Sequence, residues 1–113
     1  MEIIKDGIRI EKLKEMAVSL FGNLVKAVVD INDGVMAIGG ELHADEEQLL
    51  LDAGSKQKDL WGINLYTDKE GEDFIEFDSM INLRPSQNNR SRSVDDENIR
   101  EKIIQIVKKL VQR

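Results

Sequence analysis

Three arginines lie in a segment that contains no acidic residue, between residues 79 and 93. Serines and carboxamides separate them, and the chain's single proline lies at position 85. A guanidinium presents a planar fork of donors that matches a carboxylate or a phosphate. Hydroxyls, amides and loop N–H groups can complete an anion site. The pattern predicts a ligand-binding loop, whose candidate residues are Asn82, Arg84, Ser86, Gln87, Asn88, Asn89, Arg90 and Arg92.

A second interpretation of this arginine loop needs no ligand. The arginines would then pair with the protein's own carboxylates, such as Asp78, in a solvated surface loop. The loop also leads into a helix whose first residues, Asp95 to Glu97, would repel an anion close to the helix N-terminus. The sequence leaves both interpretations open.

The other polar constellation is Glu41, His43 and Asp45. An imidazole beside carboxylates can bind zinc, manganese or iron, or transfer protons. On a strand, Glu41 and His43 would share one face. His43 is the only histidine, so a metal site would lack the usual nitrogen ligands. We therefore assign no metal, and we keep Glu41 and His43 as catalytic candidates beside a purely structural role for the histidine.

The composition restricts the classes of function. The 113 residues carry a net charge of −6, which argues against general binding to nucleic acid. Cysteine is absent, so thiol catalysis and cysteine–zinc sites are excluded. The start of the chain has no signal-peptide pattern, and no apolar run is long enough for a membrane span, so we expect a cytoplasmic protein. No phosphate-binding or dinucleotide fingerprint is present, and the cofactor, if any, stays unknown.

Hydrophobic periodicity predicts the elements that must position these residues. Strands are expected at residues 2–5, 24–31, 35–43, 61–66 and 74–84, and an Asn-Asp-Gly turn at 32–34 should join two of them. Helical spacing begins near residue 10 and ends at Gly22, and a last helix follows a cap at Asp95 or Asp96. Residues 44–51 fit a helix or a strand, and we favour the helix. Gly39 and Gly40 indicate a bulge or a close backbone approach.

These elements predict a single α+β domain over residues 1–113, with a mainly antiparallel sheet and two long helices packed on one face. The buried residues should include Leu13, Phe21, Val29, Ile63, Phe77, Ile81, Ile103 and Val107. The other face should carry Asn64, Tyr66, Glu76, Asp78, Asn82 and Arg84. That polar face would be solvated, bind a ligand, or be covered by a partner.

Three strings resemble a known family: GGELHAD at 39–45, DLWGINLY at 59–66 and INLRPSQNNRS at 81–91. The chain is similar, over most of its length, to a prokaryotic family known as a domain of unknown function. The resemblance implies a small cytoplasmic protein of bacteria or archaea. It implies no activity, cofactor or catalytic residue.

Three hypotheses of function follow. The first is a binding module that recognises an anionic small molecule, or an acidic group of a partner, through Arg84, Arg90 and Arg92. The second is a hydrolase-type enzyme in which His43 and Glu41 do the proton transfer and the arginines hold the substrate's charge. The third is a homo-oligomer that covers the polar sheet face. The enzyme requires that His43 and the arginines share a pocket.

Overall fold

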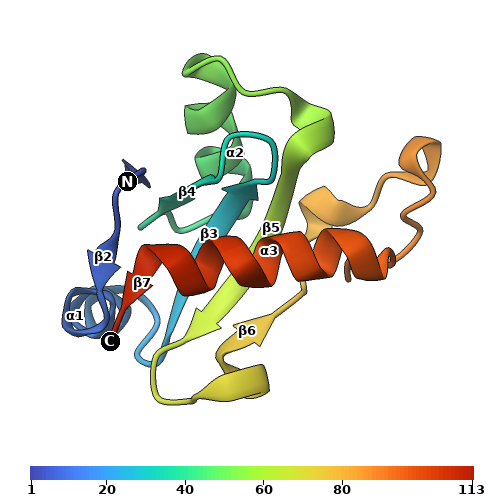
Figure 1. Cartoon of the computed structure of the whole chain (residues 1–113). Helices are drawn as coiled ribbons and strands as arrows, with labels where there is room; N and C mark the ends of the chain where they lie inside the picture. The colour runs from blue at the N-terminus through green and yellow to red at the C-terminus, as the bar shows by residue number, and fades with distance from the viewer.

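A five-stranded antiparallel sheet lies at the centre of the protein, which we describe from a computed structural model of all 113 residues (Figure 1). Its strand order is β1 (Glu2–Ile4), β4 (Val35–Ile38), β3 (Leu24–Asp30), β5 (Leu60–Tyr66) and β6 (Ile75–Glu76). A separate parallel pair joins β2 (Ile8–Arg9) to β7 (Val111–Gln112), so the segment before α1 lies beside the C-terminal end of the chain. The predicted α+β class with a mainly antiparallel sheet is confirmed.

Three α-helices surround the sheet: α1 (Ile10–Leu20), α2 (His43–Asp52) and α3 (Glu97–Leu110). Short 3-10 turns are η1 (Gln57–Asp59), η2 (Gly71–Phe74), η3 (Met80–Asn82) and η4 (Pro85–Gln87). Helix α3 begins after Asp96, whose carboxylate accepts the N–H groups of Asn98 and Ile99, as the predicted cap requires. None of the three helices has the length and apolar character that crossing a membrane would require.

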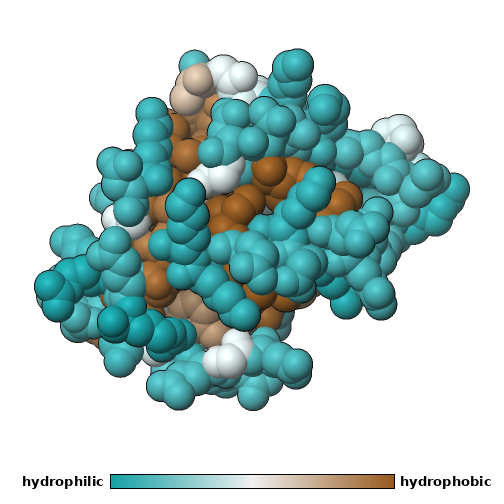
Figure 2. Space-filling model, viewed as in Figure 1, coloured by the Kyte–Doolittle hydropathy of each residue, from teal (hydrophilic) through white to brown (hydrophobic).

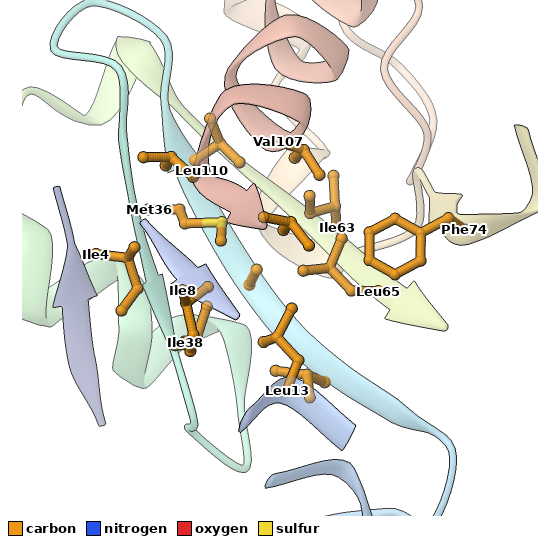
Figure 3. Packing of buried hydrophobic residues seen from close by; sticks show 14 of the residues in the cluster. Ile4, Ile8, Leu13, Met36, Ile38, Ile63, Leu65, Phe74, Val107 and Leu110 are labelled. Atoms are coloured by element: carbon orange, nitrogen blue, oxygen red, sulfur yellow. The ribbon is translucent and has the colours of Figure 1, made fainter. Parts of the chain in front are cut away.

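The larger hydrophobic core joins one sheet face to α1 and α3. Figure 3 shows Val107 and Leu110 of α3 among side chains of the sheet, such as Ile63 and Met36. Helix α1 contributes Leu13, which is fully buried. Of the residues expected to be buried, Leu13, Val29, Ile63, Ile103 and Val107 are buried. Phe21 is the clear exception with 41% exposure, because α1 ends at Leu20 and Phe21 lies beyond the packed turns; Phe77 and Ile81 are half-buried.

The opposite sheet face is not open, which corrects the prediction of a wholly polar surface. Helix α2 packs there, and Leu50 forms a smaller buried cluster with Val28, Ala37 and Leu60. Consequently β5, expected to be half-buried, is buried on both faces from Leu60 to Leu65. The polar part of this face remains only beside the N-terminus of α2.

The strand predicted over residues 74–84 is wrong. Strand β6 stops at Glu76, and the chain then crosses beside β5 and turns at η3. Gly62 permits this close approach, because a Cβ there would lie 2.6 Å from the Cβ and Oγ of Ser79. The Asn82 side chain takes the place of a strand partner, since its Oδ1 accepts the Gly62 N–H at 2.8 Å and its Nδ2 donates to the Gly62 carbonyl at 2.9 Å.

The strand predicted over residues 35–43 also ends early, at Ile38. Gly39 adopts a positive φ of 88° and leads the chain out of the sheet, so no bulge forms. The expected close approach is present at Gly40, where a Cβ would lie 2.8 Å from Cγ of Glu46. His43 is therefore the first residue of α2, and it does not share a strand face with Glu41.

Candidate functional site

Arg84, the first arginine of the loop, is a buried structural residue. Its side chain is 8% exposed and lies over the Trp61 ring, 4.7 Å from the ring centroid. The guanidinium donates to the carbonyls of Ile81, Gln57 and Leu60, and one nitrogen lies 3.6 Å from a carboxylate oxygen of Glu47. Burial lowers the pKa of Arg84, and the Glu47 carboxylate acts in the opposite direction. Because these contacts use its donors within the chain, Arg84 is poorly placed to hold an external anion.

Asn89 organises the rest of the loop. Its Nδ2 donates to the carbonyls of Asn82 and Ser93, both at 2.7 Å, and its Oδ1 accepts the N–H of Asp95 at 2.8 Å. The Asp95 carboxylate accepts the hydroxyl of Ser91 and the N–H of Arg90. These two bonds, led by the Ser91 hydroxyl, lower the pKa of Asp95. The Asn89 carboxamide, predicted to bind a ligand, thus holds the loop's own backbone.

The remaining candidates are dispersed. Ser86, Gln87, Asn88 and Arg90 are exposed, and Gln87 donates to the Lys58 carbonyl at 3.2 Å. Arg92 forms an ion pair with Asp78 through Nε, at 2.7 Å. That ion pair is the one the ligand-free interpretation named. The three arginines therefore do not converge as a single anion clamp.

Arg92 instead lines a pocket with His43, on the sheet face beside the N-terminus of α2. The cavity has a volume of about 240 Å³. We call it the sheet-face pocket; its polar lining is Lys26, His43, Asn64, Asp78, Ser79 and Arg92, and its apolar lining is Leu42, Ala44, Met80 and Ile81. Lys26 and Asn64 are directly paired on β3 and β5, and both belong to the sheet. Residues 77–82, which cross beside β5 after β6 and which we call the crossing segment, supply Asp78 to Ile81 and complete the pocket wall.

His43 has a defined protonation state in this pocket. Its Nε2 lies 2.7 Å from the Ile63 carbonyl oxygen, and since a carbonyl only accepts, Nε2 carries the proton. Burial lowers the pKa of His43, and the positive charges of Lys26 and Arg92 lower it further, against the Ile63 bond and Asp78. At neutral pH the ring is neutral. Nδ1 has no partner in the chain and is available as an acceptor or base.

Asn64 presents a second acceptor that lacks a partner. Its Nδ2 donates to Glu76 at 2.8 Å and to the Asp78 carbonyl at 3.3 Å, which fixes the orientation of the amide. Its Oδ1 is buried without a hydrogen bond, and the residue is only 8% exposed. An unpaired buried acceptor costs roughly 1–3 kcal/mol, and because this atom has almost no exposed surface, a ligand's donor would reach it only if the pocket wall moved.

Glu41, His43 and Asp45 do not come together as metal ligands. Glu41 and Asp45 are exposed and lie outside the pocket lining. No group of three or more histidine, aspartate and glutamate side chains is arranged to hold a metal ion. The carboxylate beside His43 is Asp78, which the sequence predicted as a residue of the polar face and as a partner for an arginine.

Lys26 and Ser79 were not among the site residues predicted from the sequence, and Asn64 was predicted only to lie on the polar face of the sheet. The available signal was the alternation in β3 and β5, which puts Lys26 and Asn64 on the face opposite Val25 and Ile63. The crossing that brings Ser79 to this face depends on contacts with Gly62, 17 positions earlier in the chain, and has no local signal.

The fold and the pocket define a small α+β domain with a polar pocket on an otherwise covered sheet. The chain belongs to the family described as "Protein of unknown function (DUF5674)", whose model matches residues 2–110. The expected membership of a family of unknown function is thereby confirmed. Comparison with curated proteins and with solved structures found no match.

Proposed function

We propose that the protein binds a small anionic molecule, and that the sheet-face pocket is the site. This keeps the anion-binding hypothesis but moves it from the arginine loop as a whole to Arg92 and the residues around it. The observation that carries the proposal is the convergence of Lys26 and Arg92 on a cavity that is also lined by His43, whose Nδ1 has no partner in the chain.

The two cations are suited to an anion. Lys26 has no carboxylate partner, and its ammonium lies 5.0 Å from the centroid of the Phe21 ring. Arg92 contacts Asp78 only through Nε, so its terminal nitrogens are left for a ligand. The Nδ1 acceptor of His43 adds a preference for an N–H or O–H group on the ligand. The preferred ligand is therefore a small carboxylate or phosphate that also carries a hydroxyl or amino group.

A nuclear magnetic resonance titration tests the site. Lactate, glycerol phosphate and inorganic phosphate are added to labelled protein, and we expect amide shifts at residues 42–44, 64, 78–81 and 92. Arg92→Gln should weaken binding roughly tenfold, the effect of losing one charge-assisted contact. Arg90→Gln is the matched control, since Arg90 belongs to the same loop but does not line the pocket.

Two results would contradict this assignment. One is the absence of shifts in the pocket at millimolar ligand. The other is an equal loss of binding in the Arg90→Gln and Arg92→Gln variants, which would return the site to the exposed loop.

A second candidate is acid–base catalysis, favoured by the fixed tautomer of His43. Nδ1 would take a proton from water, whose oxygen attacks the carbonyl carbon or phosphorus of a bound ester while Arg92 and Lys26 hold the ester's charge. The bond from that carbon or phosphorus to the alcohol oxygen then breaks, and the leaving alcohol takes the proton back from His43. Glu41 has no part in this version. His43→Gln should abolish hydrolysis of a phosphomonoester or carboxylester panel, and an unchanged rate in that variant would remove the proposal.

The third hypothesis, a homo-oligomer through the polar sheet face, has less surface available. Helix α2 already covers part of that face within one chain. Light scattering would test it, because a strict monomer excludes it.

A further inference from the structure

A second cavity, of about 810 Å³, lies beside α3 and is separate from the sheet-face pocket. Its apolar walls are Phe74, Ile75 and Phe77 on one side and Ile104, Val107 and Val111 on the other. Figure 1 shows α3 running across the sheet with η2 and β6 beside it, and Figure 2, in the same view, shows hydrophobic surface between the hydrophilic side chains around the helix. We call this cavity the α3 groove.

Ile104 is the informative residue of the groove. It lies outside the helical stripe of Ile99, Ile103, Ile106, Val107 and Leu110, and unlike them it neither belongs to the hydrophobic core nor packs against it. Core packing therefore does not account for an isoleucine at this position. The position of Ile104 in the wall of the groove does account for it. The volume of the groove is within the range of about 300–1,000 Å³ that is usual for small-molecule sites.

The charged residues of the groove favour an anion. Arg100, Lys108 and Arg113 line it, and none has a carboxylate within ion-pair distance, although the whole chain is acidic. Arg113 lies over the Phe74 ring at 4.6 Å and Arg100 over the Phe77 ring at 5.6 Å, so both guanidiniums rest on the aromatic wall.

Two carboxylates, Glu72 and Glu101, also line the groove, so its charge excess is small. Glu101 accepts a hydrogen bond from Gln105 at 2.7 Å. It lies two helical turns before Lys108, about 10 Å along the axis. Lys108 and Arg113 therefore lie away from Glu101, and the remaining carboxylate on their side is Glu72, in the same turn as the Phe74 ring that Arg113 covers.

We infer that the α3 groove binds an amphiphile with an unbranched hydrocarbon chain and a carboxylate head group. The hydrocarbon would lie along Ile75, Ile104 and Val107, and the head group would contact Lys108 and Arg113. The lining contains no hydroxyl or carboxamide side chain that could pair with a peptide backbone. A hydrocarbon chain needs no such partner, which separates this ligand from a peptide segment.

Dodecanoate, used below its micelle concentration, is the probe. It should shift the amides of residues 74–77 and 104–111 and leave those of the sheet-face pocket unchanged. Dodecylammonium, with the same chain and the opposite charge, and acetate, with the head group alone, should bind at least roughly tenfold more weakly.

The variant that tests the head-group contact is Lys108→Glu, which should weaken dodecanoate binding roughly tenfold or more. Lys109→Glu is the matched control: the next residue of α3, also exposed, but not part of the groove. Equal thermal unfolding of the two variants shows that the fold is retained.

The inference is overturned by any of three results. These are no shifts around the groove, equal affinity for dodecanoate and dodecylammonium, or equal weakening in the Lys108→Glu and Lys109→Glu variants. None of these results bears on the sheet-face pocket, whose ligand is tested separately.

Discussion

Glu46, a carboxyl group buried inside the protein, should make stability depend on pH. The side chain is fully buried between α2 and the N-terminal end of the chain. Its Oε2 accepts the Gly40 N–H at 2.9 Å, and its Oε1 has no partner. Burial raises the pKa of Glu46 from 4.5 to about 9, against the Gly40 bond and the positive charge of Lys26. At neutral pH the folded protein therefore holds this group protonated.

The sign of the effect follows from proton linkage. Below about pH 4.5 the group is protonated in both the folded and the unfolded chain and contributes no pH dependence. Between about pH 5 and pH 9 the unfolded chain loses the proton and the folded chain keeps it, so stability falls as pH rises. The slope is at most about 1.4 kcal/mol per pH unit. Summed over the whole window this would approach the total stability of a small domain, so the slope is an upper bound.

The perturbation is Glu46→Gln, which removes the titration and keeps the shape. At pH 7 the wild type carries a protonation cost of up to roughly 3 kcal/mol, which the variant avoids. The buried amide N–H groups of the glutamine would cost roughly 1–3 kcal/mol of that gain. The net change at pH 7 is therefore small, and the pH dependence of the difference is the informative quantity.

Urea unfolding at a series of pH values between 5 and 9 measures this difference. The stability of Glu46→Gln relative to the wild type should rise steadily with pH. Glu41→Gln is the control, because Glu41 is exposed and its replacement should leave the wild-type slope unchanged. Parallel stability curves for the wild type and Glu46→Gln would refute the reasoning, because they would show that Glu46 ionises alike in both states.

Three further predictions concern the crossing segment and are checked by the same unfolding assay. Asn82→Ala should destabilise the protein by roughly 3 kcal/mol, because the buried N–H and carbonyl of Gly62 lose their partners; a loss below about 1 kcal/mol would contradict the structure. Gly62→Ala should cost roughly 1–3 kcal/mol through overlap with Ser79, whereas Gly34→Ala, with φ of +69° and open space around it, should cost only about 1 kcal/mol. Arg84→Lys should cost roughly 2 kcal/mol although it keeps the charge, because an ammonium cannot reach three carbonyls at once; equal stability would exclude the structural role.

Elements with a strong local pattern were predictable from the sequence. The 3.6-residue spacing predicted α1 and α3, and Asp-Gly predicted the turn between β3 and β4, because neighbouring residues alone determine these features. Helix α2 was favoured over a strand and is present, but its start was misplaced. His43 was assigned to a strand because residues 35–42 alternate, and alternation does not reveal that Gly39 adopts a positive φ.

The candidate site was less predictable, because its side chains form hydrogen bonds with residues that are distant in the sequence. Arg84 and Asn82 have the residue types of an anion site, and nothing local indicates that their partners are backbone groups of Leu60 and Gly62. The sequence alone does not distinguish a polar side chain that pairs with a strand's backbone from one that binds a ligand. Only His43 and Arg92, from two separate predicted sites, were brought into one pocket.

The sheet-face pocket exists because strand β6 ends at Glu76. If β6 continued past Glu76 as the alternation predicted, its backbone would pair with Gly62, and Asn82 would not be needed there. The chain instead leaves the sheet after Glu76, and Asp78 and Ser79 form a wall opposite the N-terminus of α2. The same departure brings Arg92 beside Asp78, because the N–H of Ser79 donates to the Arg92 carbonyl at 3.0 Å. The segment after Glu76, which was predicted to continue the strand, therefore places Asp78, Ser79 and Arg92 around His43.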